Sequence, residues 1–358
     1  MTVSVRSFAK INLGLYIGAL RPDGFHELRT VYQTIALHDV IRVSVGRGSG
    51  IETRCDDPRV PLDSSNTCHH MASLVMKAME ARGKVTIEIE KRLPVQGGLG
   101  AASSNAVATL VGLEAALKQW RVVKKPLNAV ERLRIAASVG SDLPLFLIGG
   151  TVLGVGRGEE VYPLADLAST AMVVVTPELG VSTPRAFADW NALVQGDLRS
   201  GAGRSPVTTR AGTTPTAAKR ARSAQTHQLT AAASSDKLFE VGCVLSAWLS
   251  CYPDAGAPAK SGGRAGNLLS DLVRTGIEND FEKVVFPQSP ELRDMKCALE
   301  RAGSRYASLS GSGSSLYGLF RSPAEAVAAA GRLRQQGLRA VATRTLTRRQ
   351  YWRSGFRL

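Results

Sequence analysis

The stretch that decides the fold is Pro94-Val-Gln-Gly-Gly-Leu-Gly-Ala-Ala-Ser-Ser104, which runs directly into the helical pattern of residues 105–118. Residues 85–89 precede it and alternate between apolar and polar side chains, as a half-buried strand does. Glycine lets backbone N–H groups approach an anion closely, and a helix N-terminus favours negative charge. Ser103 and Ser104 add hydroxyl groups at the same place. The order strand, glycine-rich loop, helix therefore predicts either a phosphate-binding loop or a plain tight connection.

Known phosphate and nucleotide motifs do not account for this loop. It lacks the Gly-Lys-Ser/Thr ending of a Walker A loop, and the chain has neither an HRD nor a DFG motif. Gly46-Arg-Gly-Ser-Gly50 fits no dinucleotide fingerprint and indicates a hairpin turn. Ser310-Gly-Ser-Gly-Ser314 lies between two short β patterns and is either a second anion-binding loop or a hairpin loop.

Two charged residues are candidates for chemistry beside these loops. Lys10 lies in an alternating strand pattern, on the same face as Asn12 and opposite Ile11 and Leu13. It is either a solvated surface lysine or a cation for phosphate. Asp142 stands at an expected helix start, where it is either an N-cap or a carboxylate beside phosphate. Two glycine-rich loops, a lysine and an aspartate together suggest phosphoryl transfer.

The composition limits the class of protein. The 358 residues predict about two domains, and a chain with 44% hydrophobic and 21% charged residues is typical of a globular protein. No apolar run approaches the length of a membrane span, and the N-terminus lacks the apolar region of a signal peptide. Five scattered cysteines without a CxxC pair indicate neither a disulfide framework nor a zinc site. We expect a cytoplasmic protein with no membrane partner.

The net charge of +15 raises the possibility of nucleic-acid binding. Residues 198–235 carry six basic and no acidic side chains, and residues 326–358 carry eight basic and none acidic. The excess charge therefore belongs to two segments, and residues 198–235 contain no aromatic side chains for stacking on bases. We expect no nucleic-acid partner. Residues 196–235 have almost no large apolar side chains and predict a disordered insertion.

The rest of the chain shows both helical and strand periodicity. We expect helices from Asn66 onward and over residues 127–139, 238–248, 268–285, 289–302 and 323–336, and strands over residues 40–45, 51–53, 148–155, 171–176, 306–310, 314–320 and 338–345. This mixture predicts an α/β or α+β protein.

The chain resembles the GHMP kinase superfamily, named for galacto-, homoserine, mevalonate and phosphomevalonate kinases. The three superfamily motifs occur in order, as Ala9-Lys-Ile-Asn-Leu13, residues 94–104 and residues 310–315. A narrower resemblance is to the branch that phosphorylates a methylerythritol joined to cytidine diphosphate. It rests on residues 7–13, Arg21-Pro-Asp-Gly-Phe-His26, and residues 140–144, 177–183 and 279–282. The Arg21 to His26 stretch discriminates this branch from other GHMP kinases.

The resemblance implies a two-domain α/β (α+β) GHMP kinase fold with the active site in the cleft between the domains. Residues 1–160 would form an N-terminal ribosomal-protein-S5-like domain with a left-handed βαβ crossover. Residues 161–358 would form a C-terminal ferredoxin-like domain that carries the insertion. The implied cofactors are ATP and Mg²⁺, the partner is the cytidine diphosphate substrate, and the protein would be a monomer or homodimer. A homoserine- or mevalonate-type kinase and an RNA-binding protein remain as alternatives.

The resemblance also implies roles for individual residues. Asp142 would accept the proton of the 2-hydroxyl, and Lys10 would favour its ionised form and counter the charge of the transferring phosphoryl group. The implied ATP-binding residues are Asn66, Pro94, Val95, Gln96, Gly97, Gly98, Leu99, Gly100, Ala101, Ala102, Ser103 and Ser104. The implied substrate residues are Asn12, Phe25, His26 and Phe187, the C-terminal glycine loop is Gly311, Ser312 and Gly313, and no side chain is expected to hold a metal by itself.

One departure from relatives concerns the first glycine loop. Many relatives have a further glycine where this chain has Ala101 or Ala102. Because alanine disfavours positive φ, we expect a slightly different loop geometry here.

Overall fold

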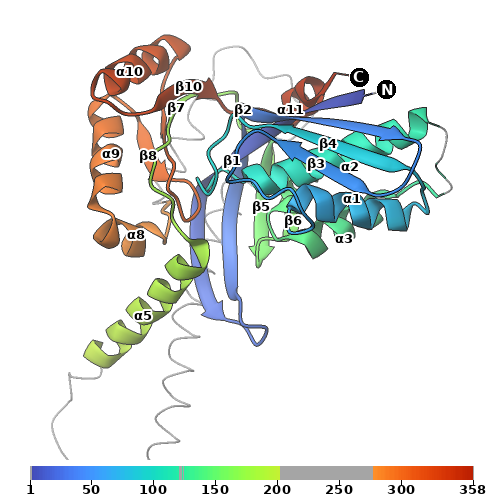
Figure 1. Ribbon diagram of the computed structural model, residues 1–358. Coiled ribbons are helices and arrows are strands. Elements are labelled where there is room, and N and C mark those ends of the chain that lie inside the picture. The colour runs from blue at the N-terminus through green and yellow to red at the C-terminus, as the bar shows by residue number, and fades with distance from the viewer. Residues whose placement is uncertain (1, 121–122, 124, 202–276, 358) are drawn as a thin grey trace, which may run out of the picture.

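A computed structural model describes residues 2–201, apart from 121, 122 and 124, and residues 277–357. These residues form two α/β units, each a sheet covered by helices (Figure 1). The expected two-domain α/β fold is therefore confirmed. No helix among the described residues is long and apolar enough to cross a membrane.

The first unit is built on two long paired strands, β1 (Thr2–Leu20) and β2 (His26–Gly46). The other strands of its sheet are β3 (Ile51–Cys55), β4 (Lys84–Glu90), β5 (Thr151–Gly156), β6 (Glu160–Pro163) and β11 (Phe356–Arg357). The order is β11-β1-β2-β4-β3, with β5 paired to β2 and β6 to β5. The helices are α1 (Thr67–Ala78), α2 (Ala101–Gln119), α3 (Ala129–Val139) and α4 (Leu143–Ile148). Apolar side chains of these helices and strands form one core, which includes Ile41, Ile87 and Leu110.

The second unit is a four-stranded antiparallel sheet in the order β10-β7-β9-β8. Its strands are β7 (Ala171–Val175), β8 (Tyr306–Leu309), β9 (Leu316–Leu319) and β10 (Ala340–Arg344). Its helices are α5 (Thr183–Gly201), α8 (Glu282–Gln288), α9 (Pro290–Arg301) and α10 (Pro323–Gln335), of which α9 and α10 flank the sheet in Figure 1. This strand order agrees with the expected ferredoxin-like arrangement.

The first strand, β1, joins the two units through the alternation of its side chains. Ile11 and Leu13 lie in a core shared with Met172 and Val174 of the second sheet, and Leu15 lies in the core of the second unit. Register shifts in the pairing with β2 fall just before Lys10 and just beyond Asn12. Because such bulges redirect side chains locally, β1 can bury an apolar face and still present polar groups to the cleft.

The last described segment returns to the first unit. Helix α11 (Arg348–Gly355) packs its Tyr351 against Phe8 of β1, and β11 then pairs with β1, which brings the labelled chain ends close together in Figure 1. The Tyr351 hydroxyl donates to the Phe146 carbonyl at 2.8 Å, and Trp352 Nε1 donates to the Ile148 carbonyl at 2.9 Å. These carbonyls belong to α4. The predicted division into residues 1–160 and 161–358 placed this segment with the C-terminal domain, whereas it completes the N-terminal sheet.

Three further expectations need correction. Residues 46–50 do not form a hairpin, because β3 runs parallel to β4 instead of pairing with β2. Helix α5 was not predicted and continues to residue 201, so residues 196–201 are helical instead of part of a disordered insertion. The apolar spacing Trp190, Val194 and Leu198 is the signal for this helix. Residues 202–235 and the helix expected over 238–248 lie outside the described residues.

The helix expected over residues 268–285 starts later in the part that the structure describes. Residues 277–281 are not helical, and Asn279 forms a β-bridge with Leu15 before α8 begins at Glu282. The cause is pairing with β1, in which Leu15 N donates to the Glu278 carbonyl at 3.0 Å and Asp280 N donates to the Leu15 carbonyl at 2.9 Å.

Candidate active site

Two cavities lie on either side of the first glycine loop, and Gly98 and Gly100 line both. The first has a volume of about 380 Å³ and is lined by residues 94–103 together with Asn66 and Lys91. The second has a volume of about 690 Å³ and is lined by Lys10, Asn12, Phe25, His26, Tyr32, Asp142, Phe187, Gly311 and Ser312 among others. The structure thus groups the predicted nucleotide residues around one cavity and the predicted catalytic and substrate residues around the other.

Lys10 and Asp142 lie next to each other in the wall of the second cavity. Lys10 Nζ lies 3.4 Å from Asp142 Oδ2, and the lysine is 4% exposed. The alternative of a solvated surface lysine is therefore wrong. Lys10 Nζ also donates to Asn12 Oδ1 at 2.7 Å, and Asn12 Nδ2 donates to Thr30 Oγ1 at 2.7 Å. Because Lys10 N donates to the Leu99 carbonyl at 2.9 Å, the ammonium group is held on β1 directly beside the first glycine loop.

Asp142 stands at the start of α4 but does not cap it. Its side chain makes no cap hydrogen bond, and its backbone is already in the right-handed helical region at φ −81°. Asp142 Oδ1 instead accepts a hydrogen bond from the Tyr32 hydroxyl at 3.0 Å. The N-cap alternative is thus not supported, and the partly exposed carboxylate is directed into the cavity beside Lys10.

The two glycine loops touch each other. The Ser310 hydroxyl donates to the Gly98 carbonyl at 3.0 Å, and Ser315 N donates to the Gly97 carbonyl at 3.1 Å. A Cβ atom at Gly98 would lie 2.1 Å from the Ser310 carbonyl oxygen, so the contact requires glycine there. Residues 310–314 therefore form a hairpin loop between β8 and β9 that also packs against the first glycine loop, and anion binding by these residues stays a prediction.

The first glycine loop, expected over residues 94–104, ends earlier than expected. Helix α2 begins at Ala101, directly after Gly100, so residues 101–104 are its first turn. Positive φ values occur at Gln96 (57°), Gly98 (72°) and Gly100 (67°) but not at Ala101 or Ala102. The alanines stand in a helix, where they are unstrained, so the expected change of loop geometry is not supported. The first N–H groups of α2 point toward the loop and lack intrahelical acceptors.

Two predicted nucleotide residues have other contacts. Ser104 is 2% exposed and its hydroxyl donates to the Phe8 carbonyl at 2.7 Å, so this hydroxyl does not line the cavity. Asn66 lines the cavity and is also the N-cap of α1: its Oδ1 accepts from Cys68 N at 2.8 Å and its Nδ2 donates to the Pro61 carbonyl at 2.6 Å. One acceptor site and one N–H of the Asn66 amide are left for other partners.

Aromatic side chains line the far end of the second cavity. His26 and Phe187 stack with ring centroids 5.5 Å apart and an interplanar angle of 6°. His26 Nδ1 lies 2.9 Å from the Gly18 carbonyl, while His26 Nε2 is buried without a hydrogen-bond partner. Phe25 is 53% exposed at the turn between β1 and β2, with the Arg157 guanidinium 5.0 Å from its ring centroid.

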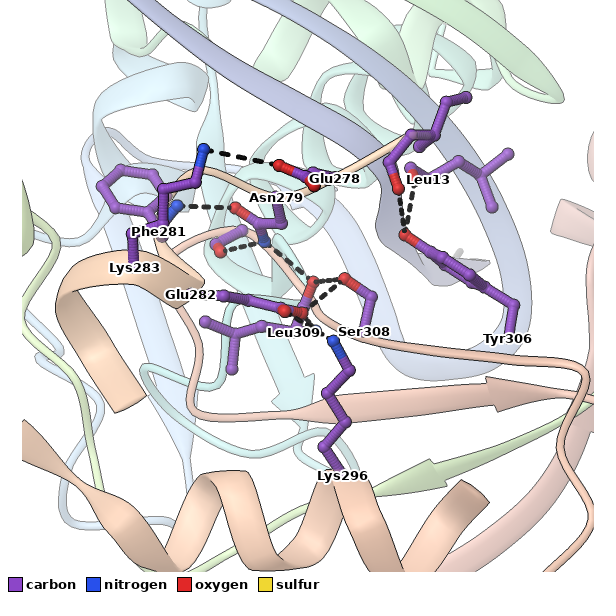
Figure 2. A network of polar contacts seen from close by, with 12 residues as sticks. Leu13, Glu278, Asn279, Phe281, Glu282, Lys283, Lys296, Tyr306, Ser308 and Leu309 are labelled. Atoms are coloured by element: carbon purple, nitrogen blue, oxygen red, sulfur yellow. Dashed lines mark hydrogen bonds and ion pairs between the residues drawn. The ribbon is translucent and has the colours of Figure 1, made fainter. Parts of the chain in front are cut away.

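A network of hydrogen bonds from residues 279–282 holds the second glycine loop in place. The Asn279 side chain donates to the Leu309 and Gly311 carbonyls at 2.9 and 2.8 Å, and its Oδ1 accepts from Phe281 N at 3.1 Å. Glu282 Oε1 accepts from the Ser308 hydroxyl and from Leu309 N (Figure 2). Residues 279–282 were part of the narrower resemblance described above. Their contacts hold the end of β8 and the start of the second glycine loop in place.

Asp39 is a supporting residue that sequence reasoning missed. It is completely buried and its carboxylate accepts from Lys91 Nζ at 2.5 Å and Asn105 Nδ2 at 2.9 Å. It also accepts from Arg92 N at 2.7 Å and Leu93 N at 2.8 Å. Asp39 therefore fixes the chain just before the phosphate loop and connects it to α2. Its sequence signal was an acidic residue within a strand pattern rich in apolar side chains.

The comparisons with known proteins agree with this geometry. Residues 66–150 match the model of the GHMP kinases N terminal domain, and residues 259–338 match that of GHMP kinases C terminal. A protein named 4-diphosphocytidyl-2-C-methyl-D-erythritol kinase from Solibacter usitatus is 34% identical over 317 residues, 88% of this chain and 81% of its own. The protein of the same name from Acaryochloris marina is 32% identical over 91% of this chain and 90% of its own. The chain belongs to the 4-diphosphocytidyl-2-C-methyl-D-erythritol kinase family.

Solved structures agree with membership of this kinase family. The crystal structure of a 4-(cytidine 5'-diphospho)-2C-methyl-D-erythritol kinase superposes with a TM-score of 0.64 at 26% identity, covering 96% of this chain and 98% of the other. A homoserine kinase from Cytophaga hutchinsonii gives a TM-score of 0.63 at 17% identity and covers 97% of this chain and 95% of its own, which shows a common fold. Family membership makes the chain an ATP-dependent kinase.

The basic C-terminal segment takes part in the fold of this kinase. Arg334 donates to the Ala340 carbonyl, and Arg348 donates to the Thr151 and Leu164 carbonyls. These guanidinium groups connect separate segments of the protein.

Proposed function

We propose that the protein transfers the γ-phosphoryl group of ATP to the 2-hydroxyl of 4-diphosphocytidyl-2-C-methyl-D-erythritol, giving the 2-phosphate and ADP in the non-mevalonate pathway of isoprenoid precursors. The observation that carries the proposal is the Lys10–Asp142 pair, which lies in the second cavity where Gly98 and Gly100 separate it from the first. A phosphoryl group on these glycines would stand next to an alcohol in the second cavity.

The nucleotide is proposed to occupy the first cavity. Its phosphates would lie against residues 97–103, where glycines at positive φ and the N-terminus of α2 favour an anion. Asn66 and residues 94–96 line the outer part of the cavity and would contact the nucleoside. Ser104 does not line this cavity, because its hydroxyl donates to the Phe8 carbonyl and its N–H donates to the Gly100 carbonyl.

The cytidine end of the acceptor is proposed to occupy the aromatic end of the second cavity. Since His26 and Phe187 already contact each other at 5.5 Å, no third ring fits between them. Phe187 therefore supports His26, and His26 Nε2, buried and without a partner, is available for a hydrogen bond to the cytosine edge. Phe25 would supply the stacking face, since more than half of its side chain is exposed.

The reacting groups follow from their contacts. Asp142 accepts the proton of the attacking hydroxyl, since its carboxylate has no cap to make and lines the cavity. Lys10 lies 3.4 Å from that carboxylate and stabilises both its charge and that of the transferring phosphoryl group. Asn12 fixes the Lys10 ammonium through its Oδ1. This division of labour suits phosphoryl transfer, which depends mostly on positioning and on stabilising charge.

Mg²⁺ is proposed to enter with the nucleotide. Among the described residues, no group of three or more His, Cys, Asp or Glu side chains is arranged to hold a metal ion. Magnesium in kinases binds mainly to substrate phosphates with one or two protein ligands, so it needs no such cluster. Ser103, which lines the first cavity, and Asp142, which lines the second, would be able to supply oxygen ligands to such an ion. When bound, the ion supplies neutralising charge to the phosphates.

A single assay tests the proposal. ATP consumption is measured with the cytidine diphosphate substrate, homoserine and mevalonate side by side, and with Asp142→Asn as the control for contaminating kinases. We expect turnover with the cytidine diphosphate substrate alone. Turnover of homoserine or mevalonate in its place would reject the proposed acceptor, and salt-sensitive RNA binding without any turnover would reject kinase activity.

A further inference from the structure

Tyr32 lies directly behind the carboxylate of Asp142. Its hydroxyl donates to Asp142 Oδ1 at 3.0 Å, while Lys10 Nζ lies 3.4 Å from Oδ2 on the other side. The two carboxylate oxygens are thus held by two groups from neighbouring strands, β2 and β1. Tyr32 also lines the second cavity, although nothing in the sequence pattern distinguished it from a core tyrosine.

The phenol of Tyr32 can act only as a hydrogen-bond donor to this carboxylate. The side chain is 2% exposed, and burial, followed by the nearby Asp142 carboxylate, raises the pKa of Tyr32 well above its usual value. The hydroxyl therefore keeps its proton throughout the physiological range. A protonated phenol next to an ionised carboxylate donates a charge-assisted hydrogen bond.

Two glycines make room for the ring of Tyr32. A Cβ atom at Gly154 would lie 2.4 Å from a ring carbon, and one at Gly158 would lie 2.5 Å from the hydroxyl oxygen. Both glycines belong to β5 and the turn that follows it. The phenol is therefore enclosed in a slot that fixes its position, and through it the position of Asp142 Oδ1.

Asp142 needs such a support because its own helix provides none. Helix α4 has only six residues, and the Asp142 side chain makes no cap hydrogen bond to it. We propose that Tyr32 is a positioning residue for phosphoryl transfer, which orients the Asp142 carboxylate so that its other oxygen faces the acceptor hydroxyl. This role rests on the proposed function of Asp142 as the proton acceptor.

The test is Tyr32→Phe, which removes one hydroxyl and keeps the ring in its slot. We expect kcat to fall about 10- to 100-fold, the loss typical of one hydrogen bond to a charged group. The KM values for ATP and for the acceptor should stay within about twofold, because orientation of the base affects the transition state more than binding. The matched control is Tyr306→Phe, which removes another buried hydroxyl, one that contacts the Leu13 and Ile277 carbonyls. This control should keep a normal kcat.

The same substitution in the Asp142→Asn variant distinguishes a positioning role of Tyr32 from a general structural role. In Asp142→Asn, the change Tyr32→Phe should no longer affect kcat, because the group that it orients has lost its function. An equal loss of kcat in both backgrounds, or a normal kcat in Tyr32→Phe alone, would overturn the proposal. If the wild-type protein phosphorylates a different alcohol, the proposed acceptor is wrong, and the same comparison with that alcohol still decides the role of Tyr32. A wild-type protein without any phosphoryl transfer would reject both.

Discussion

The Ser310 hydroxyl donates a hydrogen bond to the Gly98 carbonyl at 3.0 Å, and this contact joins two loops that are 212 residues apart in the chain. It fixes the phosphate loop against the hairpin that follows β8. The two glycine motifs therefore form one structure, and a change in either loop should affect the other.

Gly98→Ala tests this junction. The new Cβ atom would stand 2.1 Å from the Ser310 carbonyl oxygen, and φ is +72°, so both loops must shift. We expect the KM for ATP to rise at least tenfold in steady-state assays. Gly337→Ala is the control, with φ of +84° and no atom within 4 Å of its Cβ. It carries only the backbone strain of about 1–2 kcal/mol. Equal KM values for the two variants would contradict a role of the loop contact.

Asp142→Asn should reduce kcat by about 10²- to 10⁴-fold, the usual effect of losing a positioned base. The melting temperature should fall only moderately, because no cap hydrogen bond is lost and the buried Lys10 ammonium, which loses its counter-charge, keeps its hydrogen bond to Asn12. Lys10→Met should cause a similar loss of kcat. The double variant should lose much less than the product of both, since residues that act as a unit are non-additive. A normal kcat in Asp142→Asn would require another base.

Phe25→Ala should raise the KM for the cytidine diphosphate substrate about tenfold or more, if stacking on this ring contributes about 1–3 kcal/mol. The KM for ATP should stay constant, because Phe25 lines only the second cavity. The control is Leu20→Ala, which truncates a side chain of similar exposure (59%) near the same turn. Parallel changes of both KM values together with lost stability would identify Phe25 as a core residue.

Asp39→Asn should lower the free energy of unfolding by about 3–5 kcal/mol, because it removes the fully buried carboxylate that pairs with Lys91 and accepts from the N–H groups of Arg92 and Leu93. Urea unfolding followed by circular dichroism measures this loss. Glu178→Gln removes an exposed partner of Arg339 and should leave stability almost unchanged. Similar unfolding curves for the two variants would show that the Asp39 network adds little to stability.

Cys68 should resist alkylation. It is 1% exposed, and burial, only partly opposed by a hydrogen bond with Thr109, raises its pKa to about 12, so at pH 8 it stays a thiol. With Cys243 and Cys251 replaced by serine, iodoacetamide at pH 8 should label the exposed Cys297 and leave Cys68 free until urea unfolds the chain. Mass spectrometry of the peptides measures both sites, and equal labelling of the folded protein would contradict the burial of Cys68.

Local sequence patterns predicted those parts of the site that depend on neighbouring residues. The glycines of the phosphate loop and Lys10 on its strand are recognisable because loop conformation and strand alternation are local properties. Tyr32 and Asp39 were missed because their partners lie 110 and 52 to 66 residues away, where only the folded sheet brings them together.

The pairing of strands was the least predictable part of the fold. A glycine-rich turn at residues 46–50 is compatible with a hairpin, whereas β3 pairs in parallel with β4, which follows it only after α1. The helix expected over residues 268–285 was extended too far, because residues 277–281 contain the weak helix formers Asn279 and Asp280 and pair with β1 instead. Helix α11 was not predicted, because residues 348–355 lie in a segment that was described above only by its positive charge.

The docking of α11 has a consequence for synthesis on the ribosome. Tyr351 and Trp352 donate to carbonyls of α4, the helix that follows Asp142, and β11 pairs with β1. Contacts between segments so far apart in the chain form late, because the intervening residues must be translated first. A nascent chain that has folded everything up to β10 still lacks these partners. Asp142, the proposed base, therefore gains the support of α11 only after residues 351 and 352 have been translated and have docked on α4.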